Sequence, residues 1–295
     1  MRIPRFALVA AAAAALLATS CAAPDAVESP TGGSTTPALA KDDAAAALLP
    51  DAIKSAGKVR VASGVSFPPM EFFAADNKTV LGFDADLGAA LGQVLGVPFE
   101  FENTNFDGII GGLNAGRYDL ALTSMIDKKS RQETVDFVDY LSSGVSFLVV
   151  KGNKNGLKEK LDLCGRKVAV EKSATGDLTA EEINKECKTP LTKLPFPDQA
   201  SAVQALQSGR ADAVLALDLT LAYNVKQSPD AFEIASKPFG TLPVGIPVPK
   251  SNPKLRDAVQ AALKKVIESG TYDALLAKWN LTDQALKDAP INQGK

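Results

Sequence analysis

The chain contains no histidine, which restricts the chemistry that its residues can do. Without imidazole there is no Ser–His or Cys–His catalytic pair and no histidine ligand for a metal. Acid–base catalysis would need a carboxyl group in a cleft, and Glu71 is the nearest candidate. Because no paired-carboxylate signature accompanies Glu71, we expect no catalytic residue, no metal site and no cofactor.

The first 20 residues predict a signal peptide that ends just before a cysteine. Arg2 and Arg5 form a charged start, and the apolar run from Phe6 to Ala18 is too short to span a bilayer. The small residues before Cys21 resemble a bacterial lipobox, although Ala18 stands where leucine is usual. That resemblance implies cleavage before Cys21 and lipidation of its sulfur. The alternative is an ordinary signal that is cleaved nearby. Both interpretations place the protein outside the cytoplasm. With lipidation, the protein would be held at the extracellular face of the cell membrane.

Cys164 and Cys187 are the two remaining cysteines. Thiols outside the cytoplasm tend to pair, so we predict a disulfide between them. Closing the segment between them would stabilise the fold by roughly 3 kcal/mol in the chain-entropy model. The alternative is two independent buried thiols, because sequence alone does not bring the sulfurs together.

The composition predicts a globular and weakly acidic protein. Hydrophobic residues make up 46% of the chain, and the 275 residues after the signal suffice for two lobes. Their charge is about −4, from 30 basic and 34 acidic residues, without a basic cluster. We therefore expect no nucleic-acid partner. No second apolar stretch is long enough to span a membrane.

The segment after the signal predicts a tether. Residues 22–43 are rich in Ala, Pro, Ser, Thr, Gly and Asp and cannot bury much apolar surface. We assign 21–50 to a lipid-anchored flexible linker, with a short helix through 44–56 that ends near Gly57.

Beyond the linker, strand and helix signals alternate, which predicts mostly parallel sheets covered by helices. Two such series predict two α/β lobes: lobe 1 over 51–145 and 247–285, and lobe 2, inserted into it, over 146–246. The predicted strands are 59–62, 97–101, 119–122, 167–170, 192–196, 213–217 and 232–235, with extended crossing segments at 143–150 and 241–249. The predicted helices are 83–95, 106–114, 175–186, 198–207, 221–226 and a pair over 253–279 broken at Gly270.

Several short motifs occur in a specific order along this body. They are FPPMEF at 67–72, GFDADL at 82–87, FDGII at 106–110, GRYDL at 116–120, Arg131 followed by VDF at 135–137, GRADAV at 209–214, and GTY at 270–272 with KW at 278–279. With this order and spacing, over about residues 48–280, the chain resembles extracellular solute-binding protein family 3, the substrate-binding lipoproteins of polar amino-acid ABC transporters. The resemblance implies an α/β, two-lobed periplasmic-binding-protein-like fold of type II, with a two-segment hinge.

The same resemblance implies a function and a set of partners. The protein would be the extracellular substrate-binding component of an ABC importer. It would capture a small polar solute, such as an amino acid or a related carboxylate, between its lobes and deliver it to membrane permease subunits. We expect a monomer, held at the membrane through the lipid on Cys21.

The resemblance also assigns roles to individual residues. Arg131 would bind a ligand carboxylate through its guanidinium fork, assisted by Thr123 and Ser124. Without the resemblance, Arg131 would pass for a surface arginine near other charged residues. Phe67 and Phe106 would form aromatic walls around the apolar part of the ligand, and core packing is the alternative for both.

In lobe 2, the family's Gly-Thr-Thr at a helix start is replaced by Ser173, Ala174 and Thr175. Free amides there would bind an anion, and Thr175 keeps a hydroxyl, although a plain helix cap is the alternative.

Three departures from the family's pattern leave the ligand open. Gly64 and Ile126 stand where the family often has an aspartate and a threonine, and the loss at Gly64 argues against lysine- or arginine-like ligands. Leu217 stands where the family has its ammonium-binding aspartate. Asp218 follows it and would reach the cleft only if the strand ends or bulges there; otherwise it points outward or caps a helix.

Two other functions compete with transport. Some similar proteins are enzymes on the same fold, with dehydratase-like or peptidoglycan-lytic activity, which we disfavour because no acid–base signature is present. The other function is that of a receptor's sensor domain, which we disfavour because no membrane span or signalling domain follows residue 295.

Overall fold

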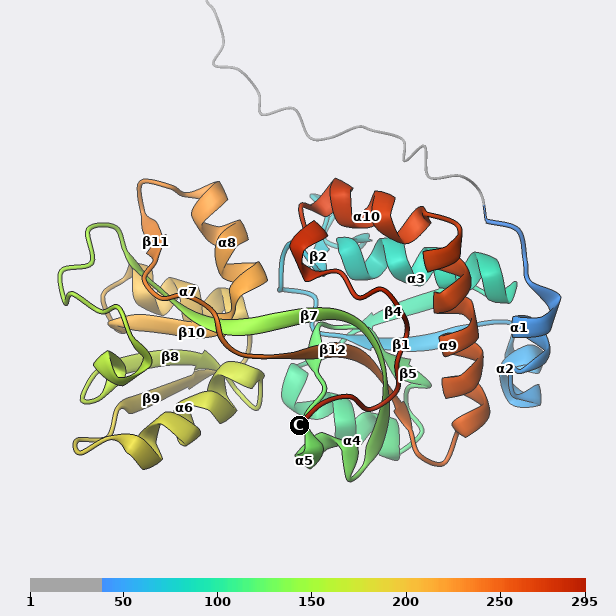
Figure 1. The fold of residues 1–295 in the computed structure, drawn as a ribbon, viewed down its shortest axis with the longest axis horizontal. Helices are drawn as coiled ribbons and strands as arrows, with labels where there is room; N and C mark the ends of the chain where they lie inside the picture. The colour runs from blue at the N-terminus through green and yellow to red at the C-terminus, as the bar shows by residue number, and fades with distance from the viewer. Residues whose placement is uncertain (1–38) are drawn as a thin grey trace, which may run out of the picture. The chain divides into compact units, whose positions relative to one another are not determined.

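The computed structural model describes residues 39–295. The predicted signal peptide, Cys21 and most of the predicted tether lie outside the described residues. Within the described part, the chain forms two α/β lobes connected by a pair of long strands (Figure 1). We call lobe 1 the body built on the sheet β4-β1-β5, and lobe 2 the body built on β8, β9, β10 and β11.

Lobe 1 is organised by a short parallel sheet with helices packed around it. Its strands are β1 (Val59–Ser63), β4 (Phe99–Asn103) and β5 (Leu120–Ala121), in the order β4-β1-β5. Its helices are α1 (Asp43–Ala47), α2 (Asp51–Ala56), α3 (Phe83–Leu95), α4 (Ile109–Asn114), α5 (Lys129–Gln132), α9 (Pro253–Glu268) and α10 (Thr271–Trp279). Helix α3 packs on both α9 and α10. The strand β4 begins later than predicted because Pro98 has no N–H to donate to the ladder.

Two long antiparallel strands cross between the lobes. They are β7 (Val135–Val150) and β12 (Phe239–Pro249). Strand β7 extends further into lobe 1 than the predicted segment 143–150, whereas β12 ends as predicted at residue 249 and begins two residues before the predicted 241. Polar residues inside β7 interrupt its apolar pattern, which explains the underprediction. Asp136, for example, lies in the strand because Lys250 and Arg256 pair with it at 2.8 and 2.9 Å.

Lobe 2 continues the sheet of the crossing strands. Beyond β7 come β10 (Ala213–Leu217), β8 (Lys167–Glu171) and β9 (Thr192–Phe196), with β11 (Phe232–Ile234) paired to the end of β7. Strands β10, β8 and β9 are parallel to one another. The covering helices are α6 (Thr175–Glu186), α7 (Gln199–Gln207) and α8 (Asp218–Gln227). Helix α8 begins three residues before its predicted start because strand β10 passes directly into it.

Short elements complete the fold. They are β2 (Phe72–Phe73) paired with β3 (Val80–Leu81), β6 (Met125–Ile126) paired with β12, and the 3₁₀ turns η1 (Phe106–Gly108), η2 (Lys160–Leu163) and η3 (Thr282–Gln284). The predicted helix at 106–114 is thus η1 followed by α4. The predicted helix at 44–56 is two helices separated by Pro50, which starts the second.

The ordered body extends beyond both predicted boundaries of lobe 1. At the start, the Asp42 N–H donates to the Val94 carbonyl, so α1 packs on α3 inside the range predicted as linker. At the end, residues 285–295 run back along β7, with bridges from Ala285 to Leu141 and from Ile291 to Val138. We call residues 285–295 the C-terminal strap.

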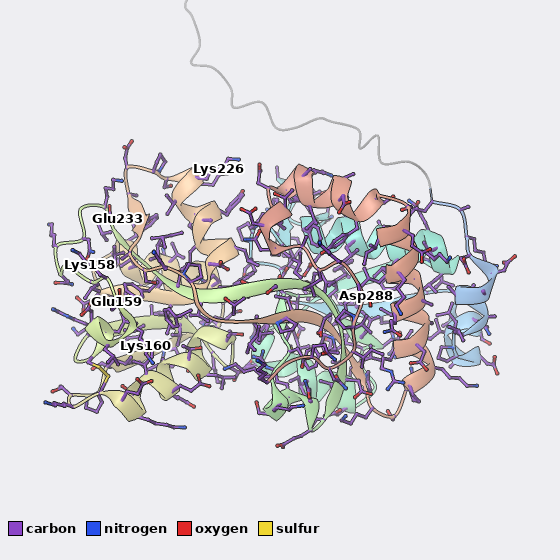
Figure 2. The ribbon with its side chains drawn as sticks, viewed as in Figure 1. Lys158, Glu159, Lys160, Lys226, Glu233 and Asp288 are labelled. Carbon is purple, nitrogen blue, oxygen red and sulfur yellow. A yellow bond between two sulfur atoms is a disulfide. The ribbon has the colours of Figure 1, made fainter. Side chains whose placement is uncertain are left out.

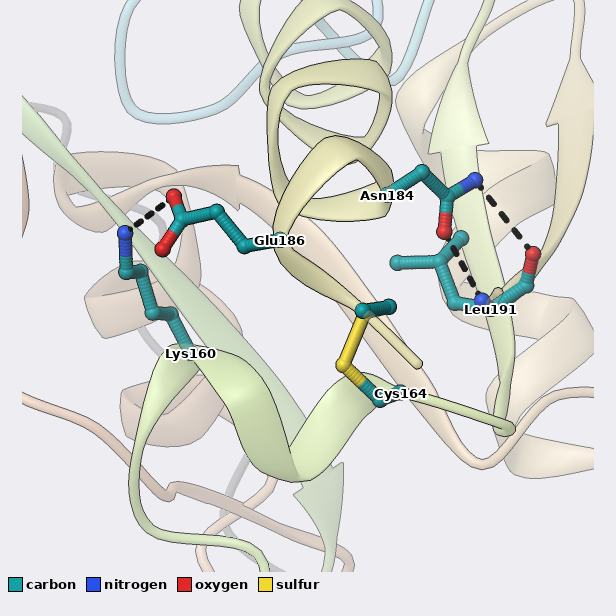
Figure 3. Close-up of a disulfide and its surroundings, with 6 residues drawn as sticks. Lys160, Cys164, Asn184, Glu186 and Leu191 are labelled. Atoms are coloured by element: carbon teal, nitrogen blue, oxygen red, sulfur yellow. Dashed lines mark hydrogen bonds and ion pairs between the residues drawn. A yellow bond between two sulfur atoms is a disulfide. The ribbon is translucent and has the colours of Figure 1, made fainter. Parts of the chain in front are cut away.

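The predicted disulfide between Cys164 and Cys187 is present. It joins the turn after η2 to the end of α6, beside the ion pair between Lys160 and Glu186 at 2.6 Å (Figure 3). Charged side chains cover the exterior of the body, among them the exposed Lys158, Lys226 and Asp288 (Figure 2). None of the helices in residues 39–295 is long and apolar enough to cross a membrane.

Candidate functional site

A cavity lies between the facing walls of the two lobes. Its volume is only about 20 Å³, so the walls are close together. Lobe 1 contributes Gly64, Phe67, Glu71, Phe106, Thr123 and Ser124; lobe 2 contributes Glu171, Ala174, Thr175, Gly176, Gln199 and residues 215–217. Five of the seven residues predicted to bind ligand line this cavity, and Arg131 and Asp218 do not.

The parallel strands of both lobes position these residues. Gly64 follows β1 and Thr123 follows β5, while Glu171 ends β8 and Leu217 ends β10. The carboxyl ends of parallel strands are the usual binding edge of an α/β sheet, because the loops and helix starts gather there. In this protein the binding edges of two sheets face each other across one cavity.

Two phenylalanines form the apolar part of the lobe 1 wall, and their contact with a ligand stays a prediction. Phe67 is 9% exposed and bridges to Glu71 across a tight turn. Phe106 begins η1, and the guanidinium carbon of Arg131 lies 5.4 Å from the centre of its ring. Phe106 lines the cavity, whereas Arg131, its cation–π partner, does not.

Most polar groups of the lobe 1 wall form hydrogen bonds with one another or with Tyr140 of β7, although Glu71 Oε2 has no partner among the described residues. The Thr123 hydroxyl accepts from the Gly64 N–H at 3.0 Å and donates to Glu71 Oε1 at 2.9 Å. The Ser124 N–H donates to Asp84 Oδ2 at 3.0 Å, and the Tyr140 hydroxyl donates to Asp84 Oδ1 at 2.8 Å. These bonds hold Ser124 in a left-handed conformation with φ +49°.

Two buried carboxyl groups share this network. Burial raises the pKa of Asp84 to about 7, while hydrogen bonds from Tyr140 and Ser124 favour its charged form. Burial, and then the Asp84 charge, raise the pKa of Glu71 well above its ordinary value. Asp84 receives more donors, so we assign the charge to Asp84 and the proton to Glu71 at neutral pH.

Arg131 lies behind the wall and connects the lobes. It is 6% exposed, its Nη1 donates to the Ile126 carbonyl at 2.9 Å, and its Nη2 donates to the Ser173 carbonyl of lobe 2 at 3.0 Å. Burial lowers its pKa to about 10, so it remains protonated at neutral pH. Its role in binding a carboxylate stays a prediction.

The lobe 2 wall begins with a strained turn into α6. Ser173 has φ +62°, and its N–H donates to Asp177 Oδ2 at 2.7 Å. Thr175 and Gly176 open the helix at the cavity, with no side-chain cap from Ala174. A Cβ on Gly176 would lie 2.0 Å from the Leu215 carbonyl oxygen, so glycine permits the close approach of α6 to β10.

Two polar residues of lobe 2 were not predicted. Glu171 is 5% exposed and Gln199 is 2% exposed, and both line the cavity. Gln199 Nε2 has no hydrogen-bond partner among the described residues. Burial raises the pKa of Glu171 to about 8, and the charges of Asp198 and Asp107 add to the effect. The sequence does contain one indication for Glu171: it is a glutamate at the end of an apolar strand, and the carboxyl ends of such strands form the edge where a binding site is expected.

Asp218 is not brought to the cavity wall. It is the first residue of α8, and its Oδ1 accepts from the Ser143 hydroxyl at 2.6 Å and from the Leu219 N–H at 2.9 Å. Leu217 faces the cavity instead. The strand does end after Leu217, but the helix that follows directs Asp218 toward β7.

Further contacts join the lobes around the cavity. The Thr220 hydroxyl donates to the Pro68 carbonyl at 2.8 Å. Lys172 pairs with Asp107 at 2.8 Å, and Lys128 pairs with Glu182 at 3.1 Å. The described residues therefore adopt a closed arrangement of the lobes. Residues 39–295 contain no group of three or more Cys, Asp or Glu side chains that could hold a metal ion.

Comparison with known proteins identifies the family. Residues 59–282 match bacterial extracellular solute-binding proteins, family 3, and the chain belongs to this family. Its two-lobed α/β architecture is the type II fold of periplasmic amino acid-binding proteins. The prediction of family and fold from the motifs is therefore confirmed.

Individual relatives share a low sequence identity with this chain but match most of its length. The chain is 27% identical to the arginine-binding protein ArgT of Corynebacterium glutamicum, over 84% of this chain and 82% of ArgT. It is 29% identical to the L-cystine-binding protein TcyJ of Escherichia coli (strain K12), over 77% of this chain and 84% of TcyJ. Among solved structures, an ancestral amino acid-binding protein, a precursor of cyclohexadienyl dehydratase, matches with TM-score 0.70 and 34% identity, over 78% of this chain and 98% of that chain.

Proposed function

We propose that this protein is the extracellular substrate-binding component of an ABC importer and that its ligand is an amino acid. The observation that carries the proposal is the closed cavity between the binding edges of the two lobes, lined by aromatic and polar groups from both. The amino acid-binding relatives support the class of ligand.

The groups around the cavity suit a zwitterion with a short stem. Arg131 and the free amides at the start of α6 would bind the carboxylate. Phe67 and Phe106 would enclose the apolar stem. The ligand would enter an open form and then hold the lobes closed, as contacts such as Thr220 to Pro68 form around it.

Two measurements on purified protein test this function. Mass spectrometry identifies the small molecule retained after purification. For calorimetry, the protein is first unfolded to release any bound ligand and is then refolded. Calorimetry then measures the binding of the standard L-amino acids and of L-cystine to this ligand-free protein. We expect at least one amino acid to bind and to reduce the radius of gyration in small-angle scattering. If none binds, the proposed function is wrong.

An enzymatic function is the alternative, supported by the likeness to a precursor of cyclohexadienyl dehydratase. Glu71 and Glu171 are the cavity carboxyl groups that could transfer a proton. Incubation of the protein with the amino acid that binds separates the two functions. Recovery of the unchanged amino acid supports binding, whereas turnover would establish an enzyme.

We also propose that a lipid on Cys21 anchors a monomer to the outer face of the cell membrane, next to its permease. The sequence before Cys21 supports this through its lipobox-like ending. Mass spectrometry of the mature N-terminal peptide should find the acylated cysteine. An unmodified mature N-terminus would instead support secretion without an anchor.

A further inference from the structure

The cavity wall of lobe 2 contains a carboxyl group that its own lobe does not use. We infer that Glu171 accepts the α-ammonium group of the bound amino acid, the role predicted for Asp218. This inference rests on the proposed function and adds the residue that recognises the amino group.

Two other carboxyl groups near the cavity are already bound. Asp218 accepts hydrogen bonds from Ser143 and from its own helix, and it does not line the cavity. Glu71 lines the cavity, and its Oε1 accepts from Thr123 while its Oε2 has no partner among the described residues. Burial, and then the Asp84 charge, raise the pKa of Glu71 well above its ordinary value. A ligand ammonium at Glu71 would have to compete with the hydrogen bond from Thr123, whereas at Glu171 it would meet no existing partner.

Glu171 differs from both in its surroundings. Within residues 39–295 its carboxyl group makes no hydrogen bond and no ion pair, and burial and the charges of Asp198 and Asp107 are what act on its pKa. It is 5% exposed, and the pairing of Val168 with Ala213 in the parallel β8–β10 ladder places Glu171 level with Ala216, beside Leu217. Glu171 thus lies beside Leu217, the position where the family has its ammonium-binding aspartate and where this chain has no hydrogen-bond acceptor in its side chain.

The charges around Glu171 favour a cationic partner. Asp198 at the start of α7 and Asp107 of η1 are the acids that act on it. The following residue, Lys172, is exposed and pairs with Asp107 at 2.8 Å rather than with Glu171. Burial without a partner is costly for a carboxylate, and a ligand ammonium would supply the missing charge and hydrogen bonds.

The test is Glu171→Gln, which keeps the shape of the side chain and removes its charge. Calorimetry uses L-arginine, L-cystine and the other standard L-amino acids, and then the deaminated analogue of each one that binds, such as deaminoarginine for L-arginine. We expect the variant to lose roughly 30-fold or more in affinity for the amino acid and less than about threefold for the deaminated analogue. Glu181→Gln, at an exposed carboxylate in α6, is the matched control and should change neither.

The outcomes separate the inference from the proposed function. If the wild-type protein binds none of the amino acids, the proposed function is wrong and the inference falls with it. If the wild type binds an amino acid and Glu171→Gln binds it equally well, only the assignment of Glu171 is overturned. Equal losses for the amino acid and its deaminated analogue would also overturn it, because the lost contact would then not involve the amino group.

Discussion

The two walls of the cavity are built from similar elements but differ in how their polar groups are bound. In lobe 1, Thr123, Glu71, Ser124 and Asp84 bond to one another or to Tyr140 of the crossing strand β7. In lobe 2, Gln199 Nε2 and the Glu171 carboxyl group have no partner within the described residues. Glu71 Oε2 is the exception in lobe 1, since it too has no partner within the described residues. The lobe 1 wall is therefore largely arranged before ligand arrives, whereas the lobe 2 wall contains a whole carboxyl group that a ligand would complete.

This difference suggests an order of events. A wall that is already hydrogen-bonded loses little entropy on binding, so lobe 1 is suited to make the first contact with a ligand. The unpartnered groups of lobe 2 would gain hydrogen bonds when the lobes close on that ligand, so their contribution to the binding free energy comes at closure. Each of the following changes tests one side of the comparison.

The largest effect is expected from Arg131→Ala, which removes the guanidinium that is bonded to Ile126 of lobe 1 and Ser173 of lobe 2. We predict a loss of about 3 kcal/mol or more in amino acid binding, because the ligand carboxylate would be buried without a charged partner. Calorimetry measures it, with the exposed Arg117→Ala in the same lobe as a control. Unchanged affinity would show that Arg131 serves only to hold Ile126 and Ser173 together.

Tyr140→Phe tests the preformed network of lobe 1. The variant removes the hydroxyl that donates to both oxygens of Asp84, at 2.8 and 3.0 Å, in a fully buried site. We predict a loss of about 2 kcal/mol in the free energy of unfolding, since a buried carboxylate loses a donor. Chemical denaturation measures it against Tyr223→Phe, whose hydroxyl has no hydrogen bond in the described part of the chain. Equal stability of the two variants would contradict the network.

Much of this fold could be predicted from the sequence, because its motifs and periodicity are local. The helix at 83–95 and the strand at 192–196 have the predicted bounds. The length of β7 and the position of residues 285–295 depend on partners far away in the chain, such as Lys250 and Arg256 around Asp136. No local pattern reports such contacts.

The candidate site divides in the same way. Phe67 and Phe106 could be proposed because short motifs contain them, and Thr175 because it stands at the family's helix start; all three line the cavity. Glu171 was missed because a glutamate at a strand end is ordinary until the opposite lobe buries it. Asp218 was a candidate on the condition that the strand ends or bulges after Leu217; the strand does end there, but the start of α8 and the Ser143 hydroxyl hold Asp218 away from the cavity wall.

Gly294→Ala tests the outer support of the lobe 1 wall. The Gly294 N–H donates to Asp127 Oδ2 at 2.6 Å, and a Cβ there would lie 2.1 Å from the Asp127 carbonyl oxygen. We predict that the strap must shift, at a cost of about 1–2 kcal/mol in the free energy of unfolding. Amide hydrogen exchange should increase in residues 285–295, whereas the exposed Lys287→Ala should leave it unchanged. A fully protected strap in the variant would show that it is not held by this contact.

The unpartnered carboxyl group of lobe 2 predicts a pH dependence. The pKa of Glu171 is raised to about 8, so the ligand-free fold favours its neutral form. The contribution of this proton to the free energy of unfolding is fully present below pH 4.5, the ordinary pKa of a glutamate, and is lost as the pH rises through 8. Glu171→Gln should therefore become more stable than the wild type as pH rises from 5 to 8, by about 1 kcal/mol. Thermal melts of the two proteins across this pH range measure the difference, and parallel pH profiles would contradict it.

The smallest effect concerns two serines with left-handed backbones, one on each side of the cavity. Ser124 of lobe 1 has φ +49° and its N–H is bound by Asp84, whereas Ser173 of lobe 2 has φ +62° at an exposed turn. A side chain in this region costs about 1 kcal/mol, and glycine avoids that cost but adds entropy to the unfolded chain. We predict that Ser173→Gly stabilises the protein by about 0.5 kcal/mol, since the Ser173 N–H and carbonyl keep their bonds to Asp177 and Arg131. Ser124→Gly should give less or none, because its hydroxyl also lies 3.5 Å from Asp84 Oδ2 and would be lost from the buried network. Denaturant titrations of both variants measure the contrast, and a larger gain at Ser124 than at Ser173 would reverse the comparison between the two walls.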